Sequence, residues 1–557
     1  MSRLPGMVYS DGIRKYKSTQ FRGYDHRIGA ENGSLWDMTN LTGDYYPVLA
    51  PRLPRYHVRK LTKPNGMCCY DGVYWVDGTS FCTENEDGTA QVLGQVTDSR
   101  KQFACLGAYI IILPDKAIYD RLNDTFGYLE AEAEVTDAQI RTGTFAEEEA
   151  VGNTISSATV DFSEYFKAGD AVKIEGISDP AYEPNATMPI IREIGTNAVT
   201  GDSELRFLEN TFFDDPEQQA LTGESITISR PVPDMDFICE NENRLWGCKG
   251  DHIYASKLGD PYNWNVFDGL ASDSYQVDVG SAGDFTACAS LLGYPVFFKE
   301  EHIYKVYGDR PSAYQVMGSA SLGVERGSHG SPAIAGEVMF YLARTGIVAY
   351  SGGIPQSIAA AFGTERYRDA VGGSDGTKYY VSMQDTAGAW HLFVYNSATG
   401  LWHREDGRQI IGFGWDEELY MLDAAGDMWV MGNARAPKSR WTREDDESPL
   451  ESVAEFGDFT EESSYRSGAE PNKKGTAKLQ LRAELEAGAS LAIDMKFDSV
   501  GQWEEVSVLQ TTVKRSFYLP IIPRRSDHFR IRLRGQGQWR LFSLVREHYV
   551  GSELRSY

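Results

Sequence analysis

Regularly spaced arginines near the C-terminal end are the clearest chemical pattern in the sequence. The segment FRIRLR at 529–534 places Arg530, Arg532 and Arg534 two residues apart, which puts all three on one face of a β-strand. From Gln502 onward, ten lysines and arginines face five acidic residues. Because guanidinium groups bind carboxylates and phosphates, the spacing predicts a strip that binds one of these anions. A solvated strand face is the alternative.

Catalytic and metal-binding patterns are missing from the sequence. The nine histidines form no H-x-x-x-H or H-E-x-x-H pair, and no Cys/His group has zinc spacing. There is also no phosphate-binding loop or D-x-D-x-D-G calcium loop. With 80 acidic residues, a pair of carboxylates is certain somewhere and therefore says nothing about a glycosidase. We expect a non-enzymatic protein without catalytic residues, cofactor or metal.

One structural unit recurs along the chain: an apolar strand, a short polar turn, and a second strand with an aromatic residue. This pattern is typical of a β-hairpin. The aromatic residues of the second strands are Phe81, Tyr119, Tyr254, Tyr304, Tyr350, Tyr395 and Trp429. Their successive separations are 38, 135, 50, 46, 45 and 34 residues, and a propeller blade takes about 40–50 residues. The spacing predicts a β-propeller of six or seven blades, with a generic all-β chain as the alternative.

The separation of 135 residues indicates an inserted domain. Between Glu130 and Arg230 the sequence has 21 acidic and 6 basic residues, which gives −15 of the chain's total charge of −26. Short alternating segments in this region predict a small β-barrel or sandwich. Its acidity indicates either a solvated face or a wall that repels a polyanion.

The last hundred residues alternate with period two beyond a polar stretch rich in Gly and Ser, which predicts a C-terminal β-sandwich of jelly-roll type. The chain as a whole is therefore predicted to be all-β: a six- or seven-bladed propeller with an inserted small β domain and a C-terminal β-sandwich. The predicted parts are an N-terminal arm with the strand that leads into the propeller (1–60), the first blades (61–129), the inserted acidic domain (130–232), the remaining blades (233–456), a linker (457–475) and the C-terminal sandwich (476–557).

Composition and charge restrict the class of protein. The 557 residues are 41% hydrophobic and 24% charged, which is typical of a soluble globular protein. The net charge of −26 disfavours non-specific binding to DNA or to anionic membranes. Seven cysteines without a C-x-x-C pair predict free thiols in a reducing compartment. With no visible signal peptide or membrane-spanning segment, we expect a soluble protein synthesised in a cytoplasm.

Several segments resemble a known family. They are ENGSLWDMTNLTGDYYPVLAPRLPRY (31–56), ENRLWGCKGDHIYASKLGDPYNWNVF (242–267), FFKEEHIYKVYGD (297–309) and GSHGSPAIAGEVMFYLARTGIVAYSGGIPQSI (327–358). Together they cover 97 of the 557 residues, and they are similar to the β-propeller proteins that form the tail nozzle, or hub, of short-tailed bacteriophages. This family is also described as packaged-DNA stabilisation proteins. The inserted acidic domain and the long C-terminal sandwich depart from the family pattern.

The resemblance implies a structural virion protein. Copies of the chain would form a ring, usually a hexamer, below the portal and head-to-tail adaptor, where it contacts other tail proteins. The ring would retain the packaged genome and conduct the phage DNA during ejection without sequence-specific binding. In that setting the strip of Arg530, Arg532 and Arg534 is expected at a subunit interface or in the channel. A receptor- or glycan-binding tail protein is the main alternative, and a propeller glycosidase is a third.

Overall fold

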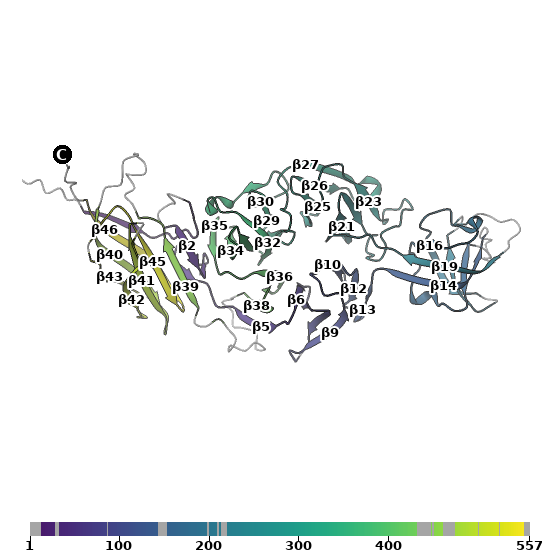
Figure 1. Cartoon of the computed structure of the whole chain (residues 1–557), viewed down its shortest axis with the longest axis horizontal. Coiled ribbons are helices and arrows are strands. Elements are labelled where there is room, and N and C mark those ends of the chain that lie inside the picture. The colour runs from purple at the N-terminus through teal and green to yellow at the C-terminus, as the bar shows by residue number, and fades with distance from the viewer. Residues whose placement is uncertain are drawn as a thin grey trace, which may run out of the picture. The chain divides into compact units, whose positions relative to one another are not determined.

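The chain is built almost entirely of β-strands (Figure 1). The computed structural model describes residues 13–27, 33–85, 87–142, 153–197, 200–208, 211–212, 220–431, 447, 450–459, 474–498, 501–522 and 524–550. Within these ranges the helices are four short 3-10 turns, at Phe162–Glu164, Pro180–Tyr182, Pro311–Ala313 and Ala359–Phe362. No helix in the described ranges is long and apolar enough to cross a membrane.

Seven four-stranded antiparallel sheets, the blades of a β-propeller, occur in the described residues. The chain forms two compact units. The insert unit, residues 65–70 and 74–324, holds blades 1–4 and the inserted domain. The sandwich unit, residues 1–64, 71–73 and 325–557, holds blades 5–7 and the C-terminal sandwich. The predicted fold class is confirmed, and the number of blades among the described residues is the larger of the two expected.

The blades of the insert unit are simple meanders, with strands paired in sequence order. Blade 1 consists of β6 (Pro64–Cys69), β7 (Val73–Asp77), β8 (Ser80–Glu84) and β9 (Ala90–Gln95). Blade 2 consists of β10 (Gln102–Leu106), β11 (Tyr109–Leu113), β12 (Ala117–Asp120) and β13 (Thr125–Tyr128). Blade 3 consists of β20 (Phe237–Asn241), β21 (Arg244–Lys249), β22 (His252–Ala255) and β23 (Tyr275–Asp278). Blade 4 consists of β24 (Ala287–Leu291), β25 (Tyr294–Lys299), β26 (His302–Tyr307) and β27 (Gln315–Ala320).

The blades of the sandwich unit follow the same pattern until the last, which takes its fourth strand from the N-terminal region. Blade 5 consists of β28 (Ala333–Ala335), β29 (Val338–Ala343), β30 (Gly346–Tyr350) and β31 (Gln356–Ser357). Blade 6 consists of β32 (Tyr367–Ser374), β33 (Lys378–Asp385), β34 (Trp390–Asn396) and β35 (Leu401–Arg404). Blade 7 consists of β36 (Ile410–Asp416), β37 (Glu418–Asp423), β38 (Asp427–Val430) and β5 (Tyr56–Lys60). The first 60 residues therefore supply a strand of the propeller itself.

The aromatic residues that revealed the repeat lie one in each blade, always on the third strand. The predicted hairpins are therefore the second and third strands of the blades. Their turns bring residues into the left-handed region, for example Gly250 at φ 59° between β21 and β22. The second strands are nearly continuous apolar runs because both of their faces are buried, which is why the repeat is visible in the sequence.

Neighbouring blades within each unit pack face to face. Their first strands contact one another, β10 with β20 and β20 with β24 in the insert unit, and β28 with β32 and β32 with β36 in the sandwich unit. Between blades 3 and 4, Trp246 and Phe297 are both buried, and their ring centroids lie 6.3 Å apart. Burying one such phenylalanine contributes about 1.5–3 kcal/mol. The aromatic content of the chain is thus largely used between blades.

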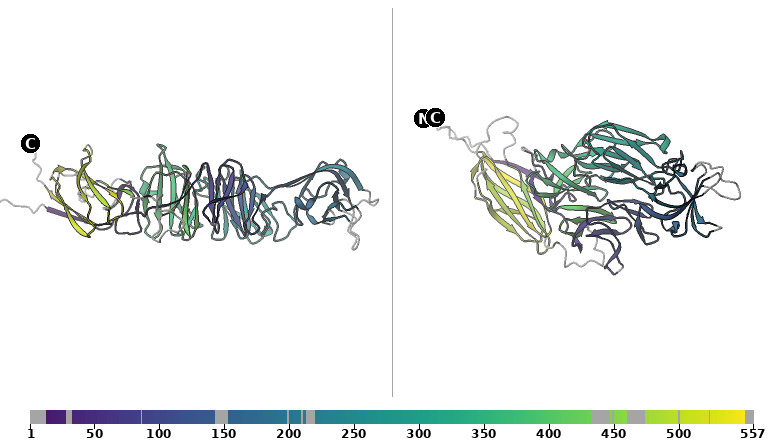
Figure 2. Two further views of the ribbon diagram at one scale, coloured as in Figure 1. Left: turned by 90° about the horizontal axis from the view of Figure 1, so that it is seen from below. Right: turned by 45° about the vertical axis from the view of Figure 1, so that its right-hand side comes forward.

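The inserted domain is one curled six-stranded sheet, a half-barrel, as Figure 2 shows in both views. The strand order is β16 (Lys173–Glu175), β19 (Ala220–Arg230), β14 (Ala131–Arg141), β15 (Thr154–Ser157), β18 (Ser203–Phe207) and β17 (Ile191–Thr196). Ala131 and Arg230 are cross-strand partners, so the two ends of the insertion leave blade 2 and enter blade 3 side by side. A domain with adjacent ends interrupts a meander without disturbing its pairing.

A buried polar group fixes this insertion to blade 3. Arg230 forms an ion pair with Asp170, and the Asn263 side-chain amide donates to Asp170 Oδ1 at 2.9 Å. The backbone N–H of Ala171 donates to Asn263 Oδ1 at 3.1 Å, and the Arg230 guanidinium lies 5.0 Å from the ring centroid of Tyr262. The segment GDPYNWN, part of the family resemblance, is therefore the attachment loop of the insertion.

The C-terminal sandwich consists of two five-stranded sheets (Figure 1). One contains β1 (Ile13–Ser18), β46 (Trp539–Val550), β40 (Lys474–Leu485) and β43 (Arg515–Leu519), with β44 (Arg525–Ser526) also paired to β40. The other has the order β2 (Leu35–Thr39), β39 (Glu451–Phe456), β45 (Phe529–Gln536), β41 (Ser490–Phe497) and β42 (Glu504–Leu509). The strands β3 (Leu41–Thr42) and β4 (Ala50–Pro51) follow β2 in the chain and form a separate two-stranded sheet.

Three strands of this sandwich come from segments that the sequence boundaries assigned elsewhere. Strands β1 and β2 belong to the predicted arm, and β39 to the predicted propeller, but β1 pairs with β46 and β39 pairs with β2 and β45. Their pairing partners lie up to about five hundred residues away, and a strand's own pattern does not identify its partner. Of the predicted linker, residues 460–473 lie outside the described residues, and β40 begins at Lys474.

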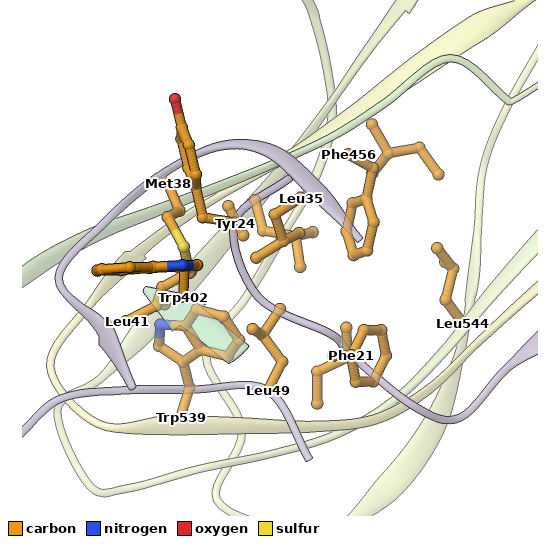
Figure 3. Close-up of a cluster of buried hydrophobic side chains, with 14 of the residues drawn as sticks. Phe21, Tyr24, Leu35, Met38, Leu41, Leu49, Trp402, Phe456, Trp539 and Leu544 are labelled. Carbon is orange, nitrogen blue, oxygen red and sulfur yellow. The ribbon is translucent and has the colours of Figure 1, made fainter. Parts of the chain in front are cut away.

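The N-terminal segment lies in the core of the sandwich unit (Figure 3). Phe21, Leu35 and Leu49 are buried together with Trp402 of blade 6 and Trp539 of β46. The Leu49 N–H and C=O both bond to Leu541 of β46, at 3.2 and 2.9 Å. Within this unit, the segment that precedes β5 therefore forms one hydrophobic core with blade 6 and the sandwich.

His403 on β35 makes the sandwich unit sensitive to mild acid. Burial lowers the pKa of His403 from its usual 6.5 to about 4. Between these two pH values His403 is protonated in the unfolded chain but neutral in the folded chain. The free energy of unfolding is therefore unaffected by His403 above pH 6.5 and decreases as the pH falls toward 4. We expect a loss of about 1–1.5 kcal/mol between pH 7 and 5.5. Urea unfolding at several pH values should show a shallower dependence for His403→Gln; parallel curves would contradict this.

Candidate functional site

Strand β45 presents the predicted arginine strip on the outer face of its sheet. Phe529, Ile531 and Leu533 are buried in the sandwich core. Because side chains alternate along a strand, Arg530, Arg532 and Arg534 all point to the opposite face. Strand β45 lies between β39 and β41, which places the strip in the middle of the sheet rather than at an edge.

Asp494 of β41 binds two of the three arginines. Arg534 donates to both carboxylate oxygens, Nε to Oδ2 at 2.7 Å and Nη2 to Oδ1 at 2.9 Å. Arg532 donates through Nε to Oδ2 at 2.9 Å. Burial favours a higher pKa of Asp494, but the hydrogen bonds from Arg534 and Arg532 lower this pKa by more than burial raises it. The carboxyl group therefore has a pKa below its usual range. The bond to Asp494 also raises the pKa of Arg534.

Further carboxylates complete the pairing of the strip. Arg534 reaches Glu505 of β42 at 2.9 Å, and Arg530 binds Asp458 at 2.5 Å and Glu455 of β39 at 3.2 Å. The strip thus carries three guanidinium groups against four carboxylates. A phosphate would have to displace one of these carboxylates to bind a strip arginine.

Two tryptophans lie against the same guanidinium groups. The Arg530 guanidinium is 5.0 Å from the ring centroid of Trp36, and that of Arg532 is 4.4 Å from Trp503. Each such contact contributes about 0.5–1 kcal/mol at an exposed site. Together with the ion pairs they join β2, β39, β45, β41 and β42 across the sheet. The local chemistry of the strip is cross-strand stabilisation.

A buried ion network, which the sequence did not predict, joins β5 to the loop between blades 6 and 7. Arg55 donates to Glu405 Oε2 and Asp406 Oδ2, each at 2.5 Å, and lies 3.5 Å from Glu447. Arg52 binds Glu447 at 2.7 Å. The network also contains Arg408 and Asp423, 3.0 Å apart. Its members are dispersed over almost four hundred residues, so no spacing in the sequence marks them.

Asp498, Asp527 and His528 form the one group in the described residues with the spacing of a metal site. One ligand atom of each lies within 4.8 Å of the others. His528 Nδ1 lies 2.7 Å from Asp527 Oδ1, and the Asp527 backbone N–H donates to Asp498 at 3.1 Å. Two carboxylates and an imidazole suit a divalent transition metal. Exposed acidic groups of this kind are also common without an ion, so the geometry alone does not assign a metal.

A glycan-binding protein needs exposed aromatic side chains that can stack on a sugar ring. Trp264 and Trp539 are buried, and Trp264 Nε1 donates to the Pro261 carbonyl at 2.9 Å. Tyr46 is exposed, and Tyr45 lies under the Arg540 guanidinium at 4.7 Å. The two tryptophans are therefore core residues and cannot stack on a sugar.

Comparison with known proteins supports no family assignment. No protein-family model matches the chain, and no curated protein matches it. Similar solved structures include Raptor of Chaetomium thermophilum, at 12% identity and a TM-score of 0.32 over 69% of this chain and 29% of Raptor. The structure of U3-55K is 8% identical in sequence and has a TM-score of 0.31. The match covers 68% of this chain and 98% of U3-55K. The WD40 repeats of RRP9 are 8% identical in sequence and have a TM-score of 0.28. The match covers 69% of this chain and 99% of the RRP9 chain. Because these scores are low, the propeller assignment rests on the sheet topology.

Proposed function

We propose that the chain is a structural protein of a bacteriophage tail, a nozzle ring that retains the packaged genome and conducts it during ejection. The observation that carries the proposal is the charge arrangement: a net charge of −26, with the arginine strip balanced by its own carboxylates. A conduit must not bind the DNA that passes through it, because each phosphate paired with Lys or Arg adds affinity. The partners would be other copies of the chain, the adaptor and further tail proteins.

The packing of the blades supports a mechanical role. Sheets that pack face to face through buried aromatic side chains, as blades 3 and 4 do through Trp246 and Phe297, form stiff walls. The ion network around Arg55 adds a buried connection between β5 and the preceding blade loop. A rigid wall suits a protein exposed to the pressure of a packaged genome.

We expect the purified chain to bind random double-stranded DNA more weakly than typical non-specific binders, with a Kd above about 10⁻⁴ M at physiological salt. The reason is the repulsion between a polyanion and a strongly acidic surface. Fluorescence anisotropy of a labelled duplex measures this, with a basic DNA-binding protein as positive control. Micromolar binding would contradict a freely passing conduit.

Electron microscopy of particles with this chain labelled tests its location. A ring of labels on the tail axis below the head supports the proposal. Labels on peripheral fibres, together with glycan binding by the isolated protein, would instead favour a receptor-binding role. Hydrolysis of a polysaccharide that is abolished by replacing two facing carboxylates would favour a glycosidase.

A further inference from the structure

The outer face of the sandwich near β43 carries cations that differ from the arginine strip. Arg482 of β40, Lys514 and Arg515 are exposed, and in the described residues none of them forms an ion pair with a carboxylate. The Lys514 ammonium lies 3.7 Å from the ring centroid of Phe542, and the Arg515 guanidinium 4.8 Å from that of Phe517. These groups keep their charge available to an external anion.

Strand register places Arg482 and Lys514 on one face of the sheet. Arg482 is the cross-strand partner of Ser516, and Gln480 that of Tyr518. The intervening residues Leu479, Leu481 and Leu519 are buried in the core, so Arg482, Ser516 and Tyr518 point outward. Lys514 is two residues before Ser516 and reaches Phe542 of β46 on the same side. Arg515 is the cross-strand partner of the buried Ala483 and therefore lies on the other face. We call Arg482, Lys514 and Tyr518 the basic edge. Glu484, opposite Arg540 on this sheet, is the nearest acidic residue in register.

Large apolar side chains are exposed around the basic edge. Tyr518 is 71% exposed, Ile522 73% and Val513 61%. Strand β43 is the last strand of its sheet in the described residues, so one side of its backbone is unpaired. Apolar groups gathered at an unpaired edge are a liability for a soluble protein unless a partner covers them. The surface therefore has the composition of an interface: an aromatic centre with cations at its margin.

The inserted domain carries the complementary charge. On β14, Glu132 and Glu134 are exposed while Ala133 and Val135 are buried, so both carboxylates lie on the outer face of the half-barrel. In the described residues neither forms an ion pair. Glu134 faces Thr227, which in turn faces Glu175 of β16. We call Glu132, Glu134 and Glu175 the acidic row. Glu175 is paired with Lys173 at 2.6 Å, so Glu132 and Glu134 supply the unpaired charge of the row. The row belongs to the region that holds −15 of the chain's charge.

We propose that the basic edge of one copy binds the acidic row of a second copy. The contact joins two different surfaces, so a pair of copies retains one free basic edge and one free acidic row. A heterologous contact of this kind repeats, and it closes into a ring when the rotation between copies permits. The proposal rests on the proposed nozzle function, which requires a ring, and it names the surfaces that build that ring.

A charge exchange tests the contact. Variant one carries Arg482→Glu and Lys514→Glu, and variant two carries Glu132→Lys and Glu134→Lys. We expect each alone to self-associate at least about tenfold more weakly than the unmodified chain, because like charges then face each other. Mixed in equal amounts, the two variants should associate again, since each reversed surface meets a reversed partner. Mass photometry and sedimentation velocity, at low and high salt, measure these states.

The control has the same charge change on the same sheet. Lys15→Glu with Lys17→Glu alters two exposed lysines of β1, which β46 and β40 separate from β43, and should leave association unchanged. Circular dichroism confirms that all variants fold, which is expected for exposed positions.

Each outcome decides something different. Association that survives both reversals overturns the proposed contact but leaves the nozzle proposal standing. A chain that stays monomeric at its highest soluble concentration also overturns the contact, while labelled particles still test the nozzle. DNA binding that is lost in variant one would assign the basic edge to nucleic acid and overturn both proposals.

Discussion

Replacing Arg55 with alanine is expected to lower the free energy of unfolding of the sandwich unit by about 3–5 kcal/mol. Arg55 is 0% exposed and neutralises three carboxylates, those of Glu405, Asp406 and Glu447. Burial opposes its charge, yet Asp406, Glu405 and Glu447 together raise the pKa of Arg55 above its usual value. Its removal leaves carboxylates that are buried or nearly so without their main counter-charge, and that loss dominates the effect.

The position of Arg55 makes the loss local as well as large. The residue directly precedes β5, the strand that completes blade 7 by pairing with β38. Hydrogen exchange should therefore show faster opening of β5 and β38 amides in Arg55→Ala, and urea unfolding should show the lower stability. Arg55→Lys keeps the charge but loses the forked geometry, so an intermediate effect is expected.

Lys60→Ala is the matched control on the same strand. Lys60 pairs with Asp427 at 2.9 Å but is largely exposed, so its loss should cost less than about 1 kcal/mol. Equal effects of Arg55→Ala and Lys60→Ala would contradict the importance of burial in this network.

The network also predicts a sensitivity to acid. Burial raises the pKa values of Asp406 and Glu447, but Arg55 and Arg52 lower them more, so both stay below their usual range. Groups with lowered pKa stabilise the fold above their unfolded pKa of about 4, and the stability is lost as the pH falls through the folded value. Arg55→Ala should therefore lose less stability on acidification below pH 4 than the unmodified chain.

The repeat was predictable because its signal is local. In each blade the second and third strands are joined by a short turn, and the continuous apolar run of the second strand reflects burial on both of its faces. The aromatic residue on the third strand, such as Tyr304 or Trp429, therefore marks a blade without knowledge of any partner. The insertion was visible because it breaks this spacing.

Long-range pairing could not be predicted in the same way. Strand β5 joins β38, and β2 joins β39, although several hundred residues separate each pair. The arginine strip shows both sides of this limit. Alternation alone places Arg530, Arg532 and Arg534 on one face. Nothing near them in sequence reveals that Asp494 of the neighbouring strand β41 accepts hydrogen bonds from two of them. The net charge of a surface depends on such partners, so the segment FRIRLR alone does not predict whether this surface is positive or negative.

Replacing Asp494 with alanine is the direct test of how the strip is balanced. Asp494 is 1% exposed and accepts hydrogen bonds from Arg532 and Arg534. Both arginines are partly exposed and regain some hydration, so we expect a loss of about 2–3 kcal/mol, below the cost of breaking a fully buried pair. Thermal and urea unfolding measure this loss.

The same change should create affinity for DNA that we do not expect of the unmodified chain. Two released guanidinium groups can each pair with a phosphate, which would add up to about −1.8 to the slope of log affinity against log salt. Glu505→Gln, which removes an exposed partner of Arg534 alone, should have a smaller effect on both measurements. If Asp494→Ala loses stability but gains no salt-dependent DNA binding, then the carboxylate stabilises the sheet without shielding the strip. The repulsion of DNA would in that case come from the acidic surface as a whole.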